Sequence, residues 1–152
     1  MTTRDLRIGD KVVYDGVIHE IIQLNNLSVR ILRNGYGRLV LSEDLEPIPI
    51  TEELLLKLGF KKDTYPLAQR DYEPIEFIYS YSLDICDYTI SIITCSKDEK
   101  CFMQIDNTGE AKCYIAIKYL HQLQNAIYLT TCNELNVNTI TDTPEPDEIS
   151  DK

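Results

Sequence analysis

The strongest constraint on the fold is a period-two pattern in residues 77–85, FIYSYSLDI. Apolar and aromatic residues occupy every second position, and mostly serine and aspartate stand between them. Such alternation is typical of a strand with one buried face. Apolar residues at alternate positions also predict three further strands, at residues 88–92, 101–105 and 113–117. The connections SKDE and NTG are short enough for hairpins. The pattern predicts an antiparallel β-meander with one apolar face that another element must cover.

The first third of the chain predicts a second, smaller β structure. Residues 8–50 contain short runs rich in β-branched residues, separated by the turn pairs Asp15-Gly16, Asn25-Asn26 and Asn34-Gly35. EPIPI, residues 46–50, offers a fifth, proline-limited edge strand. Because closure is the economical way for a few short strands to hide their edges, we expect a small SH3-like barrel.

Two helices are predicted. Thr51 can cap the first, two glutamates follow in its first turn, and Gly59 stands where a left-handed C-terminal residue belongs. Phe60 would then fold back on Leu55. The second helix is expected over residues 118–130, KYLHQLQNAIYLT, covering the meander.

These elements indicate an α+β fold. We expect an SH3-like barrel lobe in residues 1–50, then a short linking helix, the meander and its C-terminal helix in residues 51–137. Residues 61–74 read as a polar connector. Residues 138–152 contain two prolines and five acidic residues, which is typical of a flexible acidic tail.

Charge is unevenly distributed along the chain. The formal net charge is −10, but residues 1–42 contain six basic and four acidic side chains and are net positive. The overall field argues against a protein that coats nucleic acid or an anionic membrane, although a local patch can differ. No stretch approaches the roughly 20 apolar residues of a membrane span, and the first ten residues lack the apolar run of a signal peptide. We therefore expect a cytoplasmic protein without a membrane partner.

The five cysteines give no pattern of a disulfide framework or metal site. Their number is odd, and no CxxC pair occurs. We expect small buried hydrophobic side chains in a reducing compartment. A zinc site from Cys95, Cys101, Cys113 and His121 can be drawn, but its spacings match no ligand knuckle, so neither metal nor cofactor is predicted.

The second predicted helix carries two faces. At 100° per residue, a core face separates from a polar stripe. The core face comprises Tyr119, Leu120, Leu123, Ala126, Ile127 and Thr130. The polar stripe comprises His121, Gln124, Asn125 and Tyr128. The stripe is either an ordinary solvated surface or a contact surface whose amides and tyrosine bind a protein partner.

A second candidate surface is the loop RNGYGR, residues 33–38. Arg33, Tyr36 and Arg38 could contact a phosphate and stack on a base, as loops of small barrels do. The alternative is that Asn34-Gly35 and Gly37 supply the positive φ angles of a hairpin turn, with the arginines aiding solubility.

Catalytic patterns are weak. Glu52 and Glu53 belong to a helix start, and Asp84 and Asp87 to a turn, and neither pair has a histidine, lysine or metal motif nearby along the chain. We predict that the protein is not an enzyme, while a hydrolase site assembled from distant residues stays open as an alternative.

Three sequence blocks carry a resemblance. LRIGDKVVYDG, PIPITEELLLKLGF and IKYLHQLQNAIYLTTCNEL resemble, in this order, a group of small uncharacterised proteins of phages, prophages and conjugative elements of Bacteroides and its relatives. The group pattern has a glycine where Thr131-Cys132-Asn133 ends the last helix here. The resemblance implies a gene of a mobile element, but no activity, cofactor or catalytic residue.

The leading hypothesis is a non-enzymatic accessory protein that binds a host or phage protein in the bacterial cytoplasm through the helix stripe. The alternative is nucleic-acid or nucleotide binding by loop 33–38, including sequestration of a defence ligand. A homo-oligomer is compatible with either hypothesis.

Overall fold

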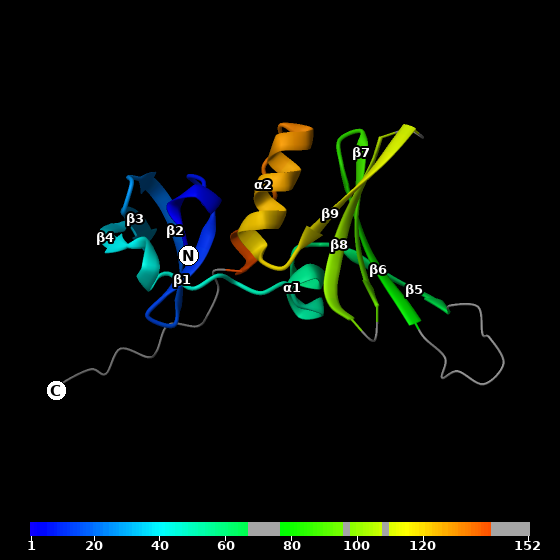
Figure 1. The fold of residues 1–152 in the computed structure, drawn as a ribbon, viewed down its shortest axis with the longest axis horizontal. Helices are drawn as coiled ribbons and strands as arrows, with labels where there is room; N and C mark the ends of the chain where they lie inside the picture. Colours follow the sequence, from blue (N-terminus) through cyan, green and yellow to red (C-terminus); the bar gives the residue numbers. More distant parts are fainter. Residues whose placement is uncertain (67–76, 96–97, 108–109, 141–152) are drawn as a thin grey trace.

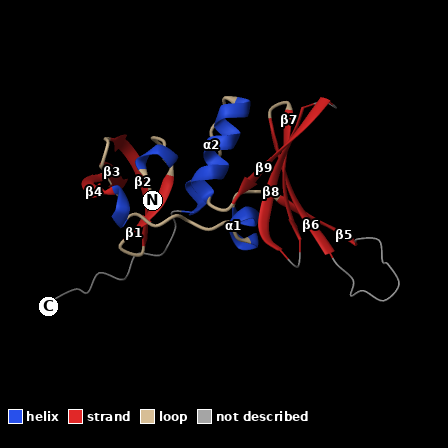
Figure 2. Cartoon of the chain, viewed as in Figure 1, coloured by secondary structure: helices blue, strands red, loops and turns tan. Residues whose placement is uncertain are grey.

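The protein contains two antiparallel sheets with a helix between them. The computed structural model describes residues 1–66, 77–95, 98–107 and 110–140. Figure 1 shows the two sheets on opposite sides of the C-terminal helix α2, Leu120–Thr131. Figure 2 shows that strands dominate both sides and that a second, shorter helix lies beside the larger sheet.

The first sheet has strands in the order of the sequence. They are β1, Lys11–Tyr14, β2, Val17–Leu24, β3, Ser28–Arg33, and β4, Tyr36–Leu41. The 3-10 turn η1, Thr3–Asp5, precedes the sheet, and η2, Ser42–Asp44, follows it. Asp15 and Asn34 take positive φ angles beside Gly16 and Gly35, so two of the predicted turn pairs form tight hairpin turns.

The prediction of an α+β fold with an SH3-like barrel was wrong: the fold is mostly β, and the first sheet is not closed. Residues 46–50 form only isolated bridges, from Glu46 to Val13 and from Pro49 to Tyr119. Pro47 and Pro49 lack the N–H groups that a continuous ladder needs, so this segment cannot extend the sheet as a fifth strand. β4 is consequently left as an edge strand.

The second sheet confirms the predicted meander. Its strands, in spatial order, are β5, Lys61–Pro66, β6, Phe77–Ile85, β7, Tyr88–Cys95, β8, Asp98–Asn107, and β9, Glu110–Ile117. β5 was predicted as part of a polar connector. Its polarity reflects its edge position, where Lys62 lies over the Tyr79 and Tyr81 rings, 4.7 and 5.9 Å from their centroids.

Helix α1, Glu52–Lys57, begins and ends as predicted. The Leu54 N–H donates to the Thr51 hydroxyl, and Gly59 takes a φ of 90°. The Phe60 N–H then donates to the Leu55 carbonyl at 3.0 Å, the bond of a Schellman stop.

Helix α2 is fixed at both ends by local hydrogen bonds. The Gln122 side chain accepts from the Lys118 and Tyr119 N–H groups. At the other end, Cys132 takes the left-handed conformation in place of the glycine of the group pattern. Thr130, predicted to face the core, is exposed, whereas Thr131 is buried and its hydroxyl donates to the Ile127 carbonyl.

Two hydrophobic cores lie on either side of α2. The smaller is enclosed by the first sheet, with Leu6 and Leu45 covering it. The larger joins the inner face of the second sheet to both helices and to the segment after α2. Its most deeply buried members are Leu55, Ile90, Ile92, Met103, Leu120, Leu123 and Ile127. Each lobe therefore has its own core.

The chain after α2 returns to the protein. Leu135 and Val137 are buried in the larger core, and Asn138–Ile140 forms the 3-10 turn η3. The predicted flexible tail therefore begins no earlier than residue 141, and residues 141–152 lie outside the described part. In the described residues, no helix is both long and apolar enough to cross a membrane.

Candidate functional site

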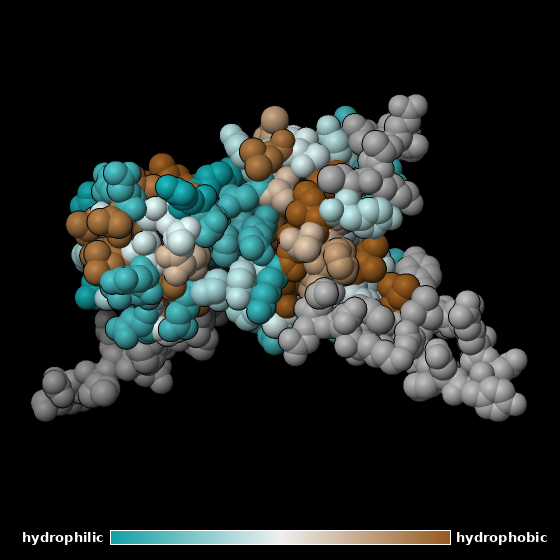
Figure 3. Space-filling view, viewed as in Figure 1, coloured by the Kyte–Doolittle hydropathy of each residue, from teal (hydrophilic) through white to brown (hydrophobic). Residues whose placement is uncertain are grey.

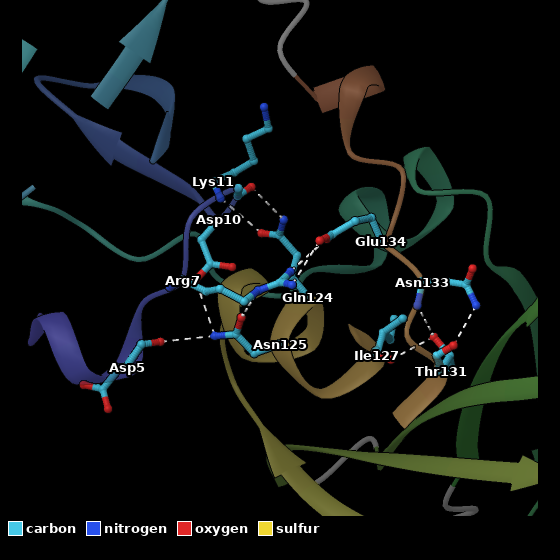
Figure 4. A network of polar contacts seen from close by, with 11 residues as sticks. Asp5, Arg7, Asp10, Lys11, Gln124, Asn125, Ile127, Thr131, Asn133 and Glu134 are labelled. Carbon is cyan, nitrogen blue, oxygen red and sulfur yellow. Dashed lines mark hydrogen bonds and ion pairs between the residues drawn. The ribbon is translucent and has the colours of Figure 1, made fainter. Parts of the chain in front are cut away.

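The polar stripe of α2 faces the N-terminal segment of the same chain. Gln124 is 1% exposed and lies against residues 9–11 (Figure 4). Its carbonyl oxygen accepts from the Lys11 N–H at 3.1 Å, and its amide donates to the Gly9 carbonyl at 3.3 Å. Gln124 thus completes the hydrogen bonding of backbone that enters β1, as a neighbouring strand would.

Asn125, one residue further along the helix, contacts three groups of the same segment. Its amide donates to the Asp5 carbonyl and to the Asp10 carboxylate, and its carbonyl oxygen accepts from Arg7 Nε at 3.0 Å. Asp10 also accepts from the Arg7 N–H at 2.7 Å. The second carboxylate oxygen of Asp10 is buried without a described partner, and burial raises the pKa of Asp10 to about 6.

Arg7 holds this interface together. Its guanidinium makes a bidentate pair with Glu134 at 3.0 and 2.8 Å, beyond the end of α2. It also lies 4.1 Å from the centroid of the Tyr128 ring. One arginine therefore joins the N-terminal segment to two positions of the helix and to the chain that follows it, and Figure 4 shows its contacts with Asn125 and Glu134.

His121 is also buried. Its ring stacks on Tyr119, 5.8 Å between centroids, and desolvation lowers its pKa. Nδ1 has no described hydrogen-bond partner.

The four predicted partner-binding residues are therefore placed mostly inside the molecule. Gln124 and Asn125 make hydrogen bonds to the N-terminal segment. The His121 ring stacks on Tyr119. Tyr128 alone is classed as exposed among the four. The directional contacts expected of the stripe do exist, but they join two lobes of one chain.

The loop of residues 33–38 has the opposite character. Asn34 and Gly35 both have positive φ, the signature of a type I′ hairpin turn between β3 and β4. Tyr36 is 83% exposed, and Arg38 is exposed on the same strand. At Gly37, an added Cβ would lie 3.2 Å from Nε of the exposed Arg30 side chain, which would have to shift slightly.

Sheet geometry brings further residues to the two arginines. Arg38 lies 5.0 Å from the centroid of the Tyr14 ring, and Tyr14 meets His19 edge-on at 6.0 Å. Desolvation and the charges of Arg33 and Arg38 lower the pKa of His19. We call Tyr14, His19, Arg33 and Arg38 the arginine cluster; β1, β2, β3 and β4 each supply one member.

A groove follows the free edge of β4 where the barrel would have closed. It has a volume of about 240 Å³ and is lined by residues 38–41 of β4 together with Tyr14, Ser28 and Asp44. Leu39 and Leu41, at this edge, are 63% and 49% exposed. Figure 3 shows hydrophobic side chains on the surface of the first sheet next to strongly hydrophilic ones.

A larger cleft of about 540 Å³ lies between the lobes, beside Gln124. Its cationic side chain, Lys11, is already paired with Glu20 at 2.7 Å. The carboxylates that the sequence assigns to a helix start and a turn make local hydrogen bonds. Glu52 accepts from Lys62 and from the Tyr81 hydroxyl, and Asp84 accepts from Thr89.

The cysteines only partly match their prediction. Cys86 and Cys132 are exposed rather than buried, and both stand at positive φ in turns, where the chain leaves a strand or helix. Cys101 is half-buried, and burial raises the pKa of its thiol. The side chains of Cys95 and Cys113 lie outside the described part. Within the described residues, no group of three or more histidine, cysteine and acidic side chains is arranged to bind a metal.

Sequence reasoning found Arg33, Tyr36 and Arg38 but missed Tyr14 and His19. Both missed residues sit in the β1–β2 hairpin. The register of β2 and β3 brings His19 beside Arg33, and Tyr14 meets Arg38 across the open edge of the sheet. A signal did exist, since the alternation of Val17, His19 and Ile21 places His19 on the buried face. Arg7 and Asp10 were missed because their partners are more than 100 residues away.

Comparison with protein-family models, with curated proteins and with solved structures gives no match.

Proposed function

We propose that the protein is a non-enzymatic binding protein that takes up an extended, acidic segment of a partner protein as an additional strand beside β4. The supporting observation is the free edge of β4, with its groove and its exposed leucines. An unpaired edge of this kind is a template for strand addition.

The hairpin register supports main-chain pairing at this edge. Arg33 and Tyr36 flank the two-residue turn and pair with each other, so they form a hydrogen-bonded pair. The bonded positions then alternate, and the backbone groups of Tyr36, Arg38 and Val40 point toward β3. Those of residues 37, 39 and 41 point outward, where an added strand would meet them.

Charge indicates the kind of segment. Residues 21–42 contain three arginines, at positions 30, 33 and 38, and no acidic residue. None of the three forms a salt bridge within the described residues. A segment that alternates acidic and apolar side chains would complement the arginines and cover Leu39 and Leu41.

The test is selection from a displayed library of short random peptides, followed by affinity measurements with two variants. Leu39→Pro removes an outward N–H, whereas Leu39→Ala removes the side chain but keeps that N–H. We expect acidic, alternating peptides whose binding is abolished by Leu39→Pro and only weakened by Leu39→Ala. Binding that survives Leu39→Pro in a folded variant would refute strand addition. Analytical ultracentrifugation tests the alternative that a second copy of the chain pairs with β4. A dimer that Leu39→Pro converts to a monomer would show this self-association.

A second candidate function is binding of single-stranded nucleic acid at the hairpin tip. It is favoured by the exposed Tyr36 ring beside Arg38, because bases stack on aromatic side chains while arginines contact phosphates. Anisotropy of a labelled oligodeoxythymidine should then fall steeply with salt and with Tyr36→Ala. Binding that is absent or independent of salt would remove this candidate.

The mobile-element origin rests on the resemblance alone, and the compartment rests on sequence features and that resemblance. That the gene belongs to a mobile element and that the protein acts in a bacterial host cytoplasm stay predictions. A protein partner that binds Tyr128 and the rest of the α2 stripe also stays a prediction.

A further inference from the structure

We propose that the arginine cluster forms a binding site for a phosphate dianion, either free or as a phosphomonoester, held by Arg33, Arg38 and His19. The site goes beyond strand addition, because an anion can occupy it without any peptide beside β4.

The register of the first sheet places the side chains of Arg33, Arg38 and His19 on one face. Arg38 pairs with Ile31, and Ile31 pairs with the buried Ile21, so Arg38 shares the inner face of the sheet. His19 precedes Glu20 by one position, and Arg33 follows Leu32 by one. Because Glu20 and Leu32 pair on the outer face, His19 and Arg33 lie on the inner face. This end of the inner face therefore carries the three nitrogen-bearing side chains of Arg33, Arg38 and His19 beside the rings of Tyr14 and Tyr36.

The opening of the sheet makes this end accessible. No ladder joins β4 to β1, and Tyr14 of β1 and Arg38 of β4 meet across the gap through a ring contact instead. The groove along β4 includes both Tyr14 and Arg38 in its lining, so a small ligand can reach the cluster from it. Tyr14 would form an apolar wall for the ester group of a phosphomonoester.

The cluster has excess positive charge. Two charged side chains, Arg33 and Arg38, lie close enough to His19 for their charges to disfavour its protonation. Glu20, the next residue, is paired with Lys11, and Asp15 lies in the adjacent β1–β2 turn. Guanidinium groups bind phosphate oxygens in bidentate fashion, so two arginines beside one histidine, with no salt bridge among the described residues, favour this class of anion.

His19 supplies a specific response. Its ring is hydrogen-bonded to the Tyr14 backbone, and its Nδ1 is buried without a described partner. In the free protein, desolvation and then the charges of the two neighbouring arginines lower the pKa of His19, so they favour the neutral imidazole. A bound dianion would cancel their field and accept a hydrogen bond from the protonated ring, so binding should be accompanied by uptake of a proton on His19.

The experiment is an NMR titration of the two histidines, His19 and His121, with pH. It is done in chloride, in inorganic phosphate and in phenyl phosphate, at equal ionic strength. We expect both phosphates to raise the pKa of His19 by about 1 unit and to leave that of the buried His121 unchanged. Phenyl phosphate should bind more tightly than phosphate if Tyr14 contacts the ester group.

Two matched variants complete the test. Arg38→Gln should abolish the response of His19, whereas Arg30→Gln, on the opposite face of the same hairpin, should preserve it. Equal shifts in chloride and phosphate, equal shifts of both histidines, or a response that survives Arg38→Gln would each overturn the site. Leu39→Pro should leave the response intact, so failure of strand addition and failure of the anion site give different results.

Discussion

Two polar regions of this protein use similar residues in opposite ways. On α2, Gln124 and Asn125 are turned inward, and together with Arg7 they bind the N-terminal segment. At the end of the first sheet, Arg33 and Arg38 converge beside an open edge, with no salt bridge to any described carboxylate. The first region connects two lobes, and the second presents charge to solvent.

The difference shows why a polar motif needs its neighbours before it is assigned a function. The blocks LRIGD and HQLQN lie against each other, and the middle block joins them through the bridge between Pro49 and Tyr119. The blocks on which the predicted resemblance rests thus meet, in large part, at one internal interface. Function is better sought where polar groups are assembled but left unpaired.

The largest effect should come from Gln124→Ala. It leaves the Gly9 carbonyl and the Lys11 N–H without a partner in a buried interface, which costs about 2–4 kcal/mol in the free energy of unfolding. Urea unfolding monitored by circular dichroism measures this. Gln23→Ala, on the exposed part of β2, is the control. A loss no larger than that of the control would show that the lobes do not depend on this contact.

Asp10 should make stability depend on pH in an unusual direction. Its pKa of about 6 in the folded protein lies above the ordinary 3.8, so its contribution is full below about pH 4 and is lost as pH rises through 6. The free energy of unfolding of wild type relative to Asp10→Asn should therefore be about 1–2 kcal/mol higher at pH 4.5 than at pH 7.5. His121 acts oppositely but is common to both proteins. A pH-independent difference between them would contradict the burial of Asp10.

Arg7→Lys should have a moderate effect. Lysine keeps the charge but cannot bind Glu134 in bidentate fashion while also donating to Asn125, so we expect a loss of about 1 kcal/mol in the free energy of unfolding. Thermal melting of this variant beside Arg4→Lys, at an exposed position, measures it. If the two variants melt together, Arg7 is not the residue that joins the lobes.

The smallest effect on stability is expected at Tyr36 and Arg38 of β4. Tyr36→Ala and Arg38→Gln remove exposed groups and should change the free energy of unfolding by less than about 0.5 kcal/mol. Chemical denaturation checks this before any binding experiment. A substantially larger loss would mean that these residues hold the sheet together, which would remove the contrast with α2.

Local signals predicted the local structure well. The meander followed from alternation, and α1 followed from Thr51 and Gly59, because these depend on residues close in sequence. The prediction of a barrel failed for two reasons. Residues 46–50 divide their backbone bridges between Val13 of the first sheet and Tyr119 before α2, and Pro47 and Pro49 lack the N–H groups that a continuous strand pairing needs. The role of the α2 stripe could not be predicted, since Arg7 and Gly9 are more than a hundred residues away and nothing local identifies them.

The most direct test of the contrast is dicarbonyl labelling of arginines in the folded protein, with each site quantified by mass spectrometry. Arg38 should be modified at a rate close to that in the unfolded chain. Arg7 should be protected, and its protection should be lost in Gln124→Ala. Equal labelling of Arg7 and Arg38 in the wild type would contradict an internal α2 interface and would return the stripe to the candidates for partner binding.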